Sequence, residues 1–213
     1  MKIYRKGTVN NSDLSNLKSD RIAYPEYYIL KKGTIIGEVM PYFRYGLLET
    51  AFSDQSDIRK LIINFDNLKK EIEKFYYVLM VDLCYLNLLY DENKGLFIID
   101  TTSWWKNQNV KDGFFLSQNM HFLNKSLFIC FCHYLFGDNY DLIIEDIEKK
   151  YQDIKGKFIG REFLSLLKEN VEGKEYMFLE LLLAYIELIK AYYGYEVETL
   201  GDIKKYTKIM KNS

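Results

Sequence analysis

The longest regular pattern in the chain is an apolar stripe between Ser56 and Met80. Its members recur three or four positions apart, as on one face of an amphipathic helix: Ile58, Leu61, Ile62, Phe65, Leu68, Ile72, Phe75 and Leu79. A second run, residues 117–136, ends in the almost wholly apolar sequence LFICFCHYLF and predicts a buried helix capped by Gly137. Further helices are expected at residues 142–151, 160–170, 174–193 and 200–210. From Gly46 onward, the pattern therefore predicts a mainly helical domain.

The first 45 residues have a different pattern, in which short strand-like stretches alternate with turns. Residues 2–5 alternate as in a strand. Residues 27–30 and 34–40 are two more strand-like runs, and the turn sequence at 31–33 between them predicts a β-hairpin. Pro41 ends the second run because proline has no N–H to donate to a sheet.

A second hairpin is predicted within residues 81–101, where two short apolar runs flank a polar turn that contains glycine. Asn87 stands just before the first run and Asp100 just after the second, while Asp82 lies in the loop leading in. Because a hairpin brings its open ends together, we expect Asn87 and Asp100 to lie close in space. Carboxylate and amide oxygens of this kind suit a hard cation such as Mg²⁺.

The spacing of Asp82, Asn87 and Asp100 resembles that of the protein kinase superfamily. The catalytic loop of that family has an Asp, an Asn five residues later, and a metal-binding Asp that closes the following hairpin. The resemblance implies that Asp82 orients or deprotonates the acceptor hydroxyl, and that Asn87 and Asp100 hold Mg²⁺ with ATP. The expected activity is ATP-dependent phosphotransfer to a Ser or Thr hydroxyl. Small-molecule phosphotransferases of the aminoglycoside kinase branch use the same three residues, and the sequence does not separate the two by substrate.

The chain departs from the family pattern around these residues. Met80 and Val81 replace the His and Arg that usually precede the catalytic Asp, and Cys84 replaces the loop Lys. Thr101 and Thr102 replace the Phe-Gly that follows the metal-binding Asp. These changes favour an alternative, a catalytically impaired pseudokinase that acts as a nucleotide-sensing or protein-binding module.

The resemblance extends to the N-terminal region, whose hairpin is similar to the last two strands of the family's small lobe. Residues 38–42 then correspond to the hinge that binds adenine, with Glu38 at its start and Met40 shaping the pocket. Lys2 stands where the family has the strand Lys that contacts the phosphates. No G-x-G-x-x-G phosphate loop is present. The family also places an anchoring Asp near the start of the helix at 117–136, where Asn119 and Asn124 are the nearest candidates here.

The predicted fold is therefore α+β and protein kinase-like, with a small truncated β lobe and a larger, mainly α-helical lobe. Residues 1–45 would form the small region with the hinge. Residues 46–213 would form the large domain and contain the hairpin at 81–101.

Composition narrows the expected partners and location. A formal charge of −1, from 29 basic and 30 acidic residues, gives no electrostatic case for nucleic acid. The chain has three cysteines, an odd number, and Cys130 and Cys132 are too close together to suggest a disulfide framework. Reduced thiols, as in a cytoplasmic protein, are therefore expected. The first residues lack the apolar region of a secretory signal, and charged residues interrupt the apolar run at 176–193, so no membrane span is expected. The expected partners are a nucleotide and a protein substrate or binding partner.

Overall fold

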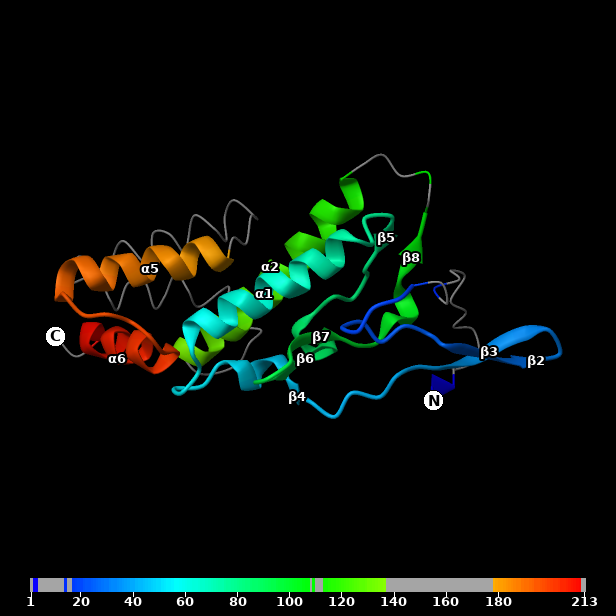
Figure 1. Cartoon of the computed structure of the whole chain (residues 1–213), viewed down its shortest axis with the longest axis horizontal. Coiled ribbons are helices and arrows are strands. Elements are labelled where there is room, and N and C mark those ends of the chain that lie inside the picture. The colour runs from blue at the N-terminus through cyan, green and yellow to red at the C-terminus, as the bar shows by residue number, and fades with distance from the viewer. Residues whose placement is uncertain are drawn as a thin grey trace. The chain divides into compact units, whose positions relative to one another are not determined.

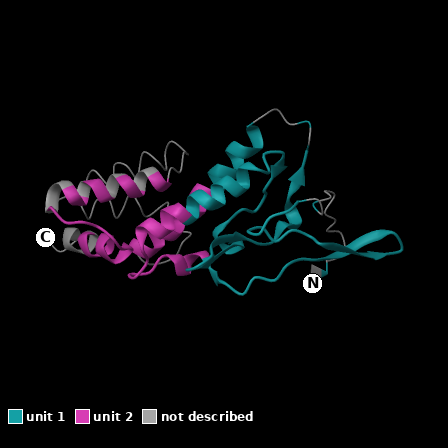
Figure 2. Ribbon diagram, in the orientation of Figure 1, with its two compact units in different colours: residues 1–47, 64–122 teal, residues 48–63, 123–213 magenta. Residues whose placement is uncertain are grey.

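The computed structural model shows a mixed α+β protein with small antiparallel sheets and long helices (Figure 1). The described residues are 2–3, 14, 17–107, 109, 113–136 and 178–211. The α+β class predicted from the sequence is confirmed at this level, and the kinase-like architecture stays a prediction. The chain divides into two compact units (Figure 2). Unit 1 comprises residues 1–47 and 64–122, and unit 2 comprises residues 48–63 and 123–213. The proposed division at residue 45 also stays a prediction.

The N-terminal strands of unit 1 form an antiparallel sheet in the order β1-β3-β2. These strands are β1 (Lys2–Ile3), β2 (Tyr27–Lys31) and β3 (Thr34–Val39). The predicted hairpin is thus confirmed. Its turn residues, Lys32 and Gly33, have φ angles of 50° and 77°, as in the turns that best match the twist of a hairpin. On the central strand, Glu38 lies opposite Lys2 on one side and Tyr28 on the other.

A second sheet of unit 1 contains the hairpin predicted at residues 81–101. It is formed by β4 (Gly46–Leu47), β6 (Leu88–Asp91) and β7 (Gly95–Ile98) in the order β4-β6-β7. The hairpin register runs from Leu88 opposite Ile98 to Asp91 opposite Gly95. All four residues of β7 are buried, which explains the continuous apolar run in the sequence.

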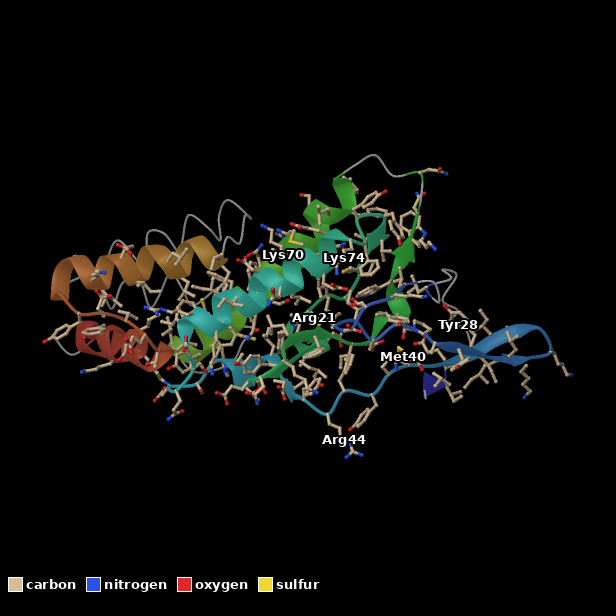
Figure 3. The ribbon with its side chains drawn as sticks, in the orientation of Figure 1. Arg21, Tyr28, Met40, Arg44, Lys70 and Lys74 are labelled. Atoms are coloured by element: carbon tan, nitrogen blue, oxygen red, sulfur yellow. The ribbon has the colours of Figure 1, made fainter. Side chains whose placement is uncertain are left out.

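The turn of this hairpin is held by an arginine from an earlier segment. The side chain of Arg21 is labelled in Figure 3. Its Nη1 donates to Lys94 O at 2.8 Å and to Leu96 O at 3.2 Å. The backbone of the same segment pairs with β7, because Ile98 N donates to Arg21 O and Ala23 N donates to Ile98 O, both at 2.8 Å. The segment at 21–23 therefore covers one edge of the hairpin.

The helix predicted between Ser56 and Met80 is shorter than expected. Helix α1 spans Ile58–Glu73, and turns at 74–77 lead to the short strand β5 (Val78–Leu79). The prediction was wrong at this end because Phe75, Val78 and Met80 are all buried, so the apolar spacing continues after the helix has stopped.

The segment that follows the hairpin also contains regular structure. It includes the strand β8 (Trp105–Lys106), which pairs with β5. Two 3₁₀ turns flank the hairpin, η2 (Tyr85–Asn87) before it and η3 (Thr101–Ser103) after it. The pairing of β5 with β8 joins the segment before the hairpin to the segment after it.

The predicted helix at 117–136 is confirmed as α2 (Phe114–Phe136), which begins three residues earlier. Unit 2 contains η1 (Leu48–Ala51), and it contains α5 (Phe178–Tyr193) and α6 (Leu200–Lys211), which are close to the predictions for the C-terminal helices. The helices expected at 142–151 and 160–170, and the start of the one expected at 174, lie outside the described residues. None of the helices in the described part of the chain is long and apolar enough to cross a membrane.

The core of unit 2 is aromatic. Phe52, Phe131 and Phe178 pack with ring centroids 5.6 to 6.4 Å apart, two of the pairs edge to face. The start of α6 is fixed by backbone bonds, since Leu200 N donates to Ser56 O and Gly201 N to Asp54 O. Unit 2 is thus held together by packing and by main-chain contacts between distant segments.

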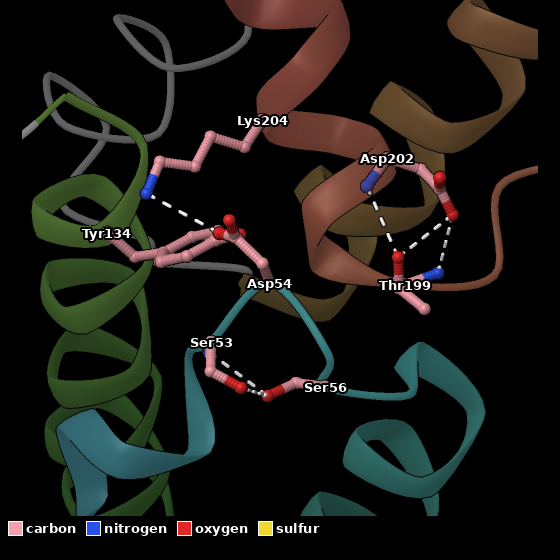
Figure 4. Close-up of polar contacts among 7 residues, drawn as sticks. All are labelled: Ser53, Asp54, Ser56, Tyr134, Thr199, Asp202 and Lys204. Atoms are coloured by element: carbon pink, nitrogen blue, oxygen red, sulfur yellow. Dashed lines mark hydrogen bonds and ion pairs between the residues drawn. The ribbon is translucent and has the colours of Figure 1, made fainter.

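A polar cluster beside these contacts also joins α2, α6 and the loop before α1 (Figure 4). The Tyr134 hydroxyl donates to Asp54 Oδ1 at 2.7 Å, and Lys204 Nζ lies 3.5 Å from the same oxygen. Lys204 Nζ also lies 4.4 Å from the centroid of the Tyr134 ring. Partial burial, together with the hydrogen bond to Asp54, raises the pKa of Tyr134. This cluster is well suited to fastening α6, and none of the predicted site residues belongs to it.

Candidate functional site

The side chain of Asn87 stabilises the loop that carries Asp82. Asp82 is exposed and adopts a left-handed backbone conformation with φ 65°, which Asp tolerates better than most residues. Its carbonyl oxygen accepts hydrogen bonds from Cys84 N at 2.7 Å and from Asn87 Nδ2 at 2.9 Å. The structure thus brings Asp82 and Asn87 together through the backbone of one and the side chain of the other. The carboxylate of Asp82 is left facing solvent.

Asn87 and Asp100 flank the open end of the hairpin, just before β6 and shortly after β7. Asn87 O accepts a hydrogen bond from Ile99 N at 2.9 Å, so the pairing of the two strands continues one step beyond β6 and β7. Asp100 follows directly, in a left-handed conformation with φ 58° and ψ 63° that turns the chain into η3. Because Asn87 uses its amide nitrogen on Asp82, its Oδ1 remains as an oxygen ligand.

Glu38 lies beside Asp100, although the sequence placed it only at the start of a hinge. The Thr102 hydroxyl lies 2.7 Å from Glu38 Oε1 and 2.8 Å from Asp100 Oδ1. Met40 approaches the same turn, with its sulfur 3.8 Å from Thr101 Oγ1. Lys2 occupies the position opposite Glu38 in the sheet register. Two of the predicted residues, Glu38 and Met40, therefore contact the turn that begins at Asp100.

Asn119 supports the approach to the Asp82 loop. It is fully buried in α2, accepts a hydrogen bond from Met80 N at 2.8 Å, and donates one to Val78 O at 2.8 Å. Of the two asparagines suggested by the sequence, Asn119 is the one whose side-chain contacts reach the backbone just before Asp82. Both ends of its amide are used, so an apolar side chain at this position would leave two buried backbone groups without a partner.

The contacts of the turn after Asp100 were missed by sequence reasoning. Thr101 Oγ1 donates to Ala23 O at 3.0 Å, and Ser103 Oγ donates to Val81 O at 3.1 Å. The available signal was the run of three hydroxyl residues, Thr101–Thr102–Ser103, at the place where the family has Phe-Gly. We name this run the hydroxyl cluster.

The site has few carboxylates for a metal. Within the part of the chain that the structure describes, no group of three or more His, Cys, Asp or Glu side chains is arranged to hold a metal ion. Asn87 and Asp100 together offer one carboxylate and one amide oxygen. Such a set suits Mg²⁺ that arrives with a nucleotide, because Mg²⁺ is commonly held by one or two carboxylates together with phosphates and water.

Comparisons with known proteins add no assignment. Neither the models of known protein families nor the curated proteins give a match to this chain.

Proposed function

We propose that this protein is an ATP- and Mg²⁺-dependent phosphotransferase of the protein kinase-like superfamily, acting on a Ser or Thr hydroxyl. The observation that carries the proposal is the arrangement at the open end of the hairpin. An exposed Asp82 is held in its loop by Asn87, whose main chain pairs with the residue preceding Asp100. A chance occurrence of the Asp82–Asn87–Asp100 spacing would not require these contacts.

Each residue has a role in this proposal. Asp82 accepts the proton of the acceptor hydroxyl as that hydroxyl attacks the γ-phosphorus, and the bond from the γ-phosphorus to the bridging oxygen breaks. Asn87 and Asp100 hold Mg²⁺, which offsets the negative charge of the phosphates. Lys2 contacts the phosphates, and the segment that begins at Glu38 lines the base through Met40. The free state of all three cysteines supports a cytoplasmic site of action.

The alternative is a pseudokinase that binds a nucleotide or a protein without transferring phosphate. The hydroxyl cluster favours it, because three side-chain bonds hold the shape of the site in place of the family's Phe-Gly. A rigid site of this kind suits binding as well as catalysis. Protein partners and nucleotide sensing both belong to this second proposal.

Metal-dependent nucleotide binding is the first test. ATP with Mg²⁺ should stabilise the fold, while ATP without a divalent cation should not. Ligand at ~100 times its dissociation constant adds ~2.7 kcal/mol, which should raise the melting temperature by roughly 5–10 °C for a chain of this size. Thermal denaturation with millimolar ATP, with and without Mg²⁺ or Mn²⁺, measures the effect. The absence of any shift would overturn both the enzyme and the nucleotide sensor.

The variant Asp100→Asn isolates the contribution of the metal. Asn tolerates the left-handed conformation of residue 100, so the turn should be retained while one charge is lost. The metal-dependent part of the shift should fall and the melting temperature without ligand should change little. An unchanged metal-dependent shift would remove Asp100 from the metal site.

A further inference from the structure

The hydroxyl cluster ties the turn after Asp100 to three separate segments of unit 1. Thr101 bonds to Ala23 and Ser103 bonds to Val81, in each case through a backbone carbonyl. Thr102 differs, because its hydroxyl contacts two carboxylates. It is therefore the member of the hydroxyl cluster that touches an ionisable group of the proposed site.

The two carboxylates that Thr102 contacts have very different settings. Glu38 is fully buried on the central strand of the N-terminal sheet, between Lys2 and Tyr28 in the register. Asp100 is half-buried and follows the last strand of the hairpin in a left-handed conformation. Glu38 is thus fixed by its strand, whereas Asp100 lies at a turn whose orientation depends on side-chain bonds.

The chemistry of one hydroxyl between two carboxylates favours a cation. A hydroxyl has a single proton, so Thr102 donates to Glu38 or to Asp100 but not to both at once. A cation on Asp100 would reduce the repulsion between the two carboxylates, so that both can stay close to the Thr102 hydroxyl. The buried carboxyl group of Glu38 would in turn contribute to the attraction of the site for that cation.

We propose that Thr102 is a positioning residue that holds the Asp100 carboxylate against the buried Glu38, so that Asp100 is oriented for the divalent cation of a bound nucleotide. The proposal rests on the proposed function and deepens it. It also gives Glu38 a role at the metal end of the site. Partners that orient a metal ligand commonly change metal affinity by roughly 10–100-fold when they are removed.

The test compares variants that differ in one hydroxyl. Thr102→Val keeps the shape and removes the hydroxyl, and Thr102→Ser restores it. Thr34→Val makes the same chemical change at the exposed start of β3 and is the matched control. The melting temperature is measured at fixed ATP over a titration of Mg²⁺. Thr102→Val should raise the half-saturating Mg²⁺ concentration on the order of tenfold, while Thr102→Ser and Thr34→Val should match the wild type.

The outcomes separate the two proposals. A metal-dependent shift in the wild type with the same Mg²⁺ dependence in Thr102→Val would overturn the role of Thr102 and leave the proposed function standing. No metal-dependent shift in the wild type would overturn both. If Thr102→Val does not fold, Glu38→Gln decides instead, because it removes the negative charge while keeping an oxygen for Thr102. Glu38→Gln should then raise the Mg²⁺ requirement, and wild-type behaviour would overturn the inference.

Discussion

At the scale of single residues, the site depends on side chains that use both of their functional atoms. Asn87 donates from its nitrogen to Asp82 O and keeps its oxygen for a ligand. An ionised Asp at the same position would also have an oxygen for a ligand, but it could not donate to Asp82 O. Asn119 likewise accepts from Met80 and donates to Val78. The asparagines therefore shape the loop, while Asp82 is exposed to solvent.

Asp82 is the residue whose change should separate catalysis from binding. We expect Asp82→Asn to lower the rate of phosphotransfer by about 10²–10⁴-fold, the usual contribution of a positioned proton acceptor. Asn tolerates the left-handed conformation at this position, so the loop and the shift induced by ATP and Mg²⁺ should be retained. Transfer from labelled ATP to the protein itself or to a generic acceptor measures the rate.

The exposed Asp20 provides the control for this change. Asp20→Ala removes a carboxylate outside the site and should leave the rate unaltered. Equal rates in the wild type and in Asp82→Asn would refute the catalytic role of Asp82. Rates at background in both, together with a retained nucleotide shift, would favour the pseudokinase.

At the scale of elements, the hairpin of β6 and β7 positions the site, and its turn requires glycine. Gly95 has φ 92°, and a Cβ there would lie 2.5 Å from Asn64 Oδ1 and 3.0 Å from Arg21 Nη1. Arg21 in turn bonds to the carbonyls on either side of Gly95. A Cβ at this position would therefore displace the side-chain ends of Asn64 and Arg21, in addition to the strain of a positive φ.

Gly95→Ala should destabilise the protein more than Gly33→Ala. Gly33 has φ 77°, but a Cβ at Gly33 would meet nothing within 4 Å, so Gly33→Ala reports backbone strain alone, ~1 kcal/mol. Gly95→Ala adds the displacement of Arg21 and Asn64 and should cost roughly 2–3 kcal/mol. Urea unfolding of the two variants gives the comparison. Equal losses would show that the turn can adjust around a methyl group.

The elements differ in how far the sequence could predict them. Both hairpins and α2 were predictable, because their turn residues and apolar runs are local signals. The end of α1 was not predictable, because buried apolar residues continue at similar intervals in the turn and strand that follow the helix. The strand β8 has only two residues, too few for a periodic signal. Side-chain bonds such as Thr102 to Glu38 join residues 64 positions apart, and no local pattern indicates them.

At the scale of the whole molecule, the burial of titratable groups affects the pH range in which the fold is stable. Unit 2 buries two thiols on α2, and burial raises the pKa of Cys130 from 9.0 to about 12, with a smaller contribution from Glu49. Burial also raises the pKa of Cys132, with Cys130 adding to the effect. Both shifts favour the neutral thiol, so these cysteines are structural and unreactive at neutral pH.

The same shifts predict a loss of stability at alkaline pH. A thiol whose pKa is higher in the folded chain than in the unfolded chain contributes stability that is complete below 9.0, the ordinary pKa, and decreases as the pH rises towards the folded value. At about pH 10, each thiol should already have cost roughly 1 kcal/mol of the free energy of unfolding. The double variant Cys130→Ala and Cys132→Ala should therefore lose less stability than the wild type between neutral pH and about pH 10.

Leu127→Val is the control, because it opens a small cavity in the same helix without removing a titrating group. It should lose as much stability over this pH range as the wild type. Urea unfolding at the two pH values measures the difference, and a double variant that loses as much stability as the wild type would show that the alkaline limit is set by other groups.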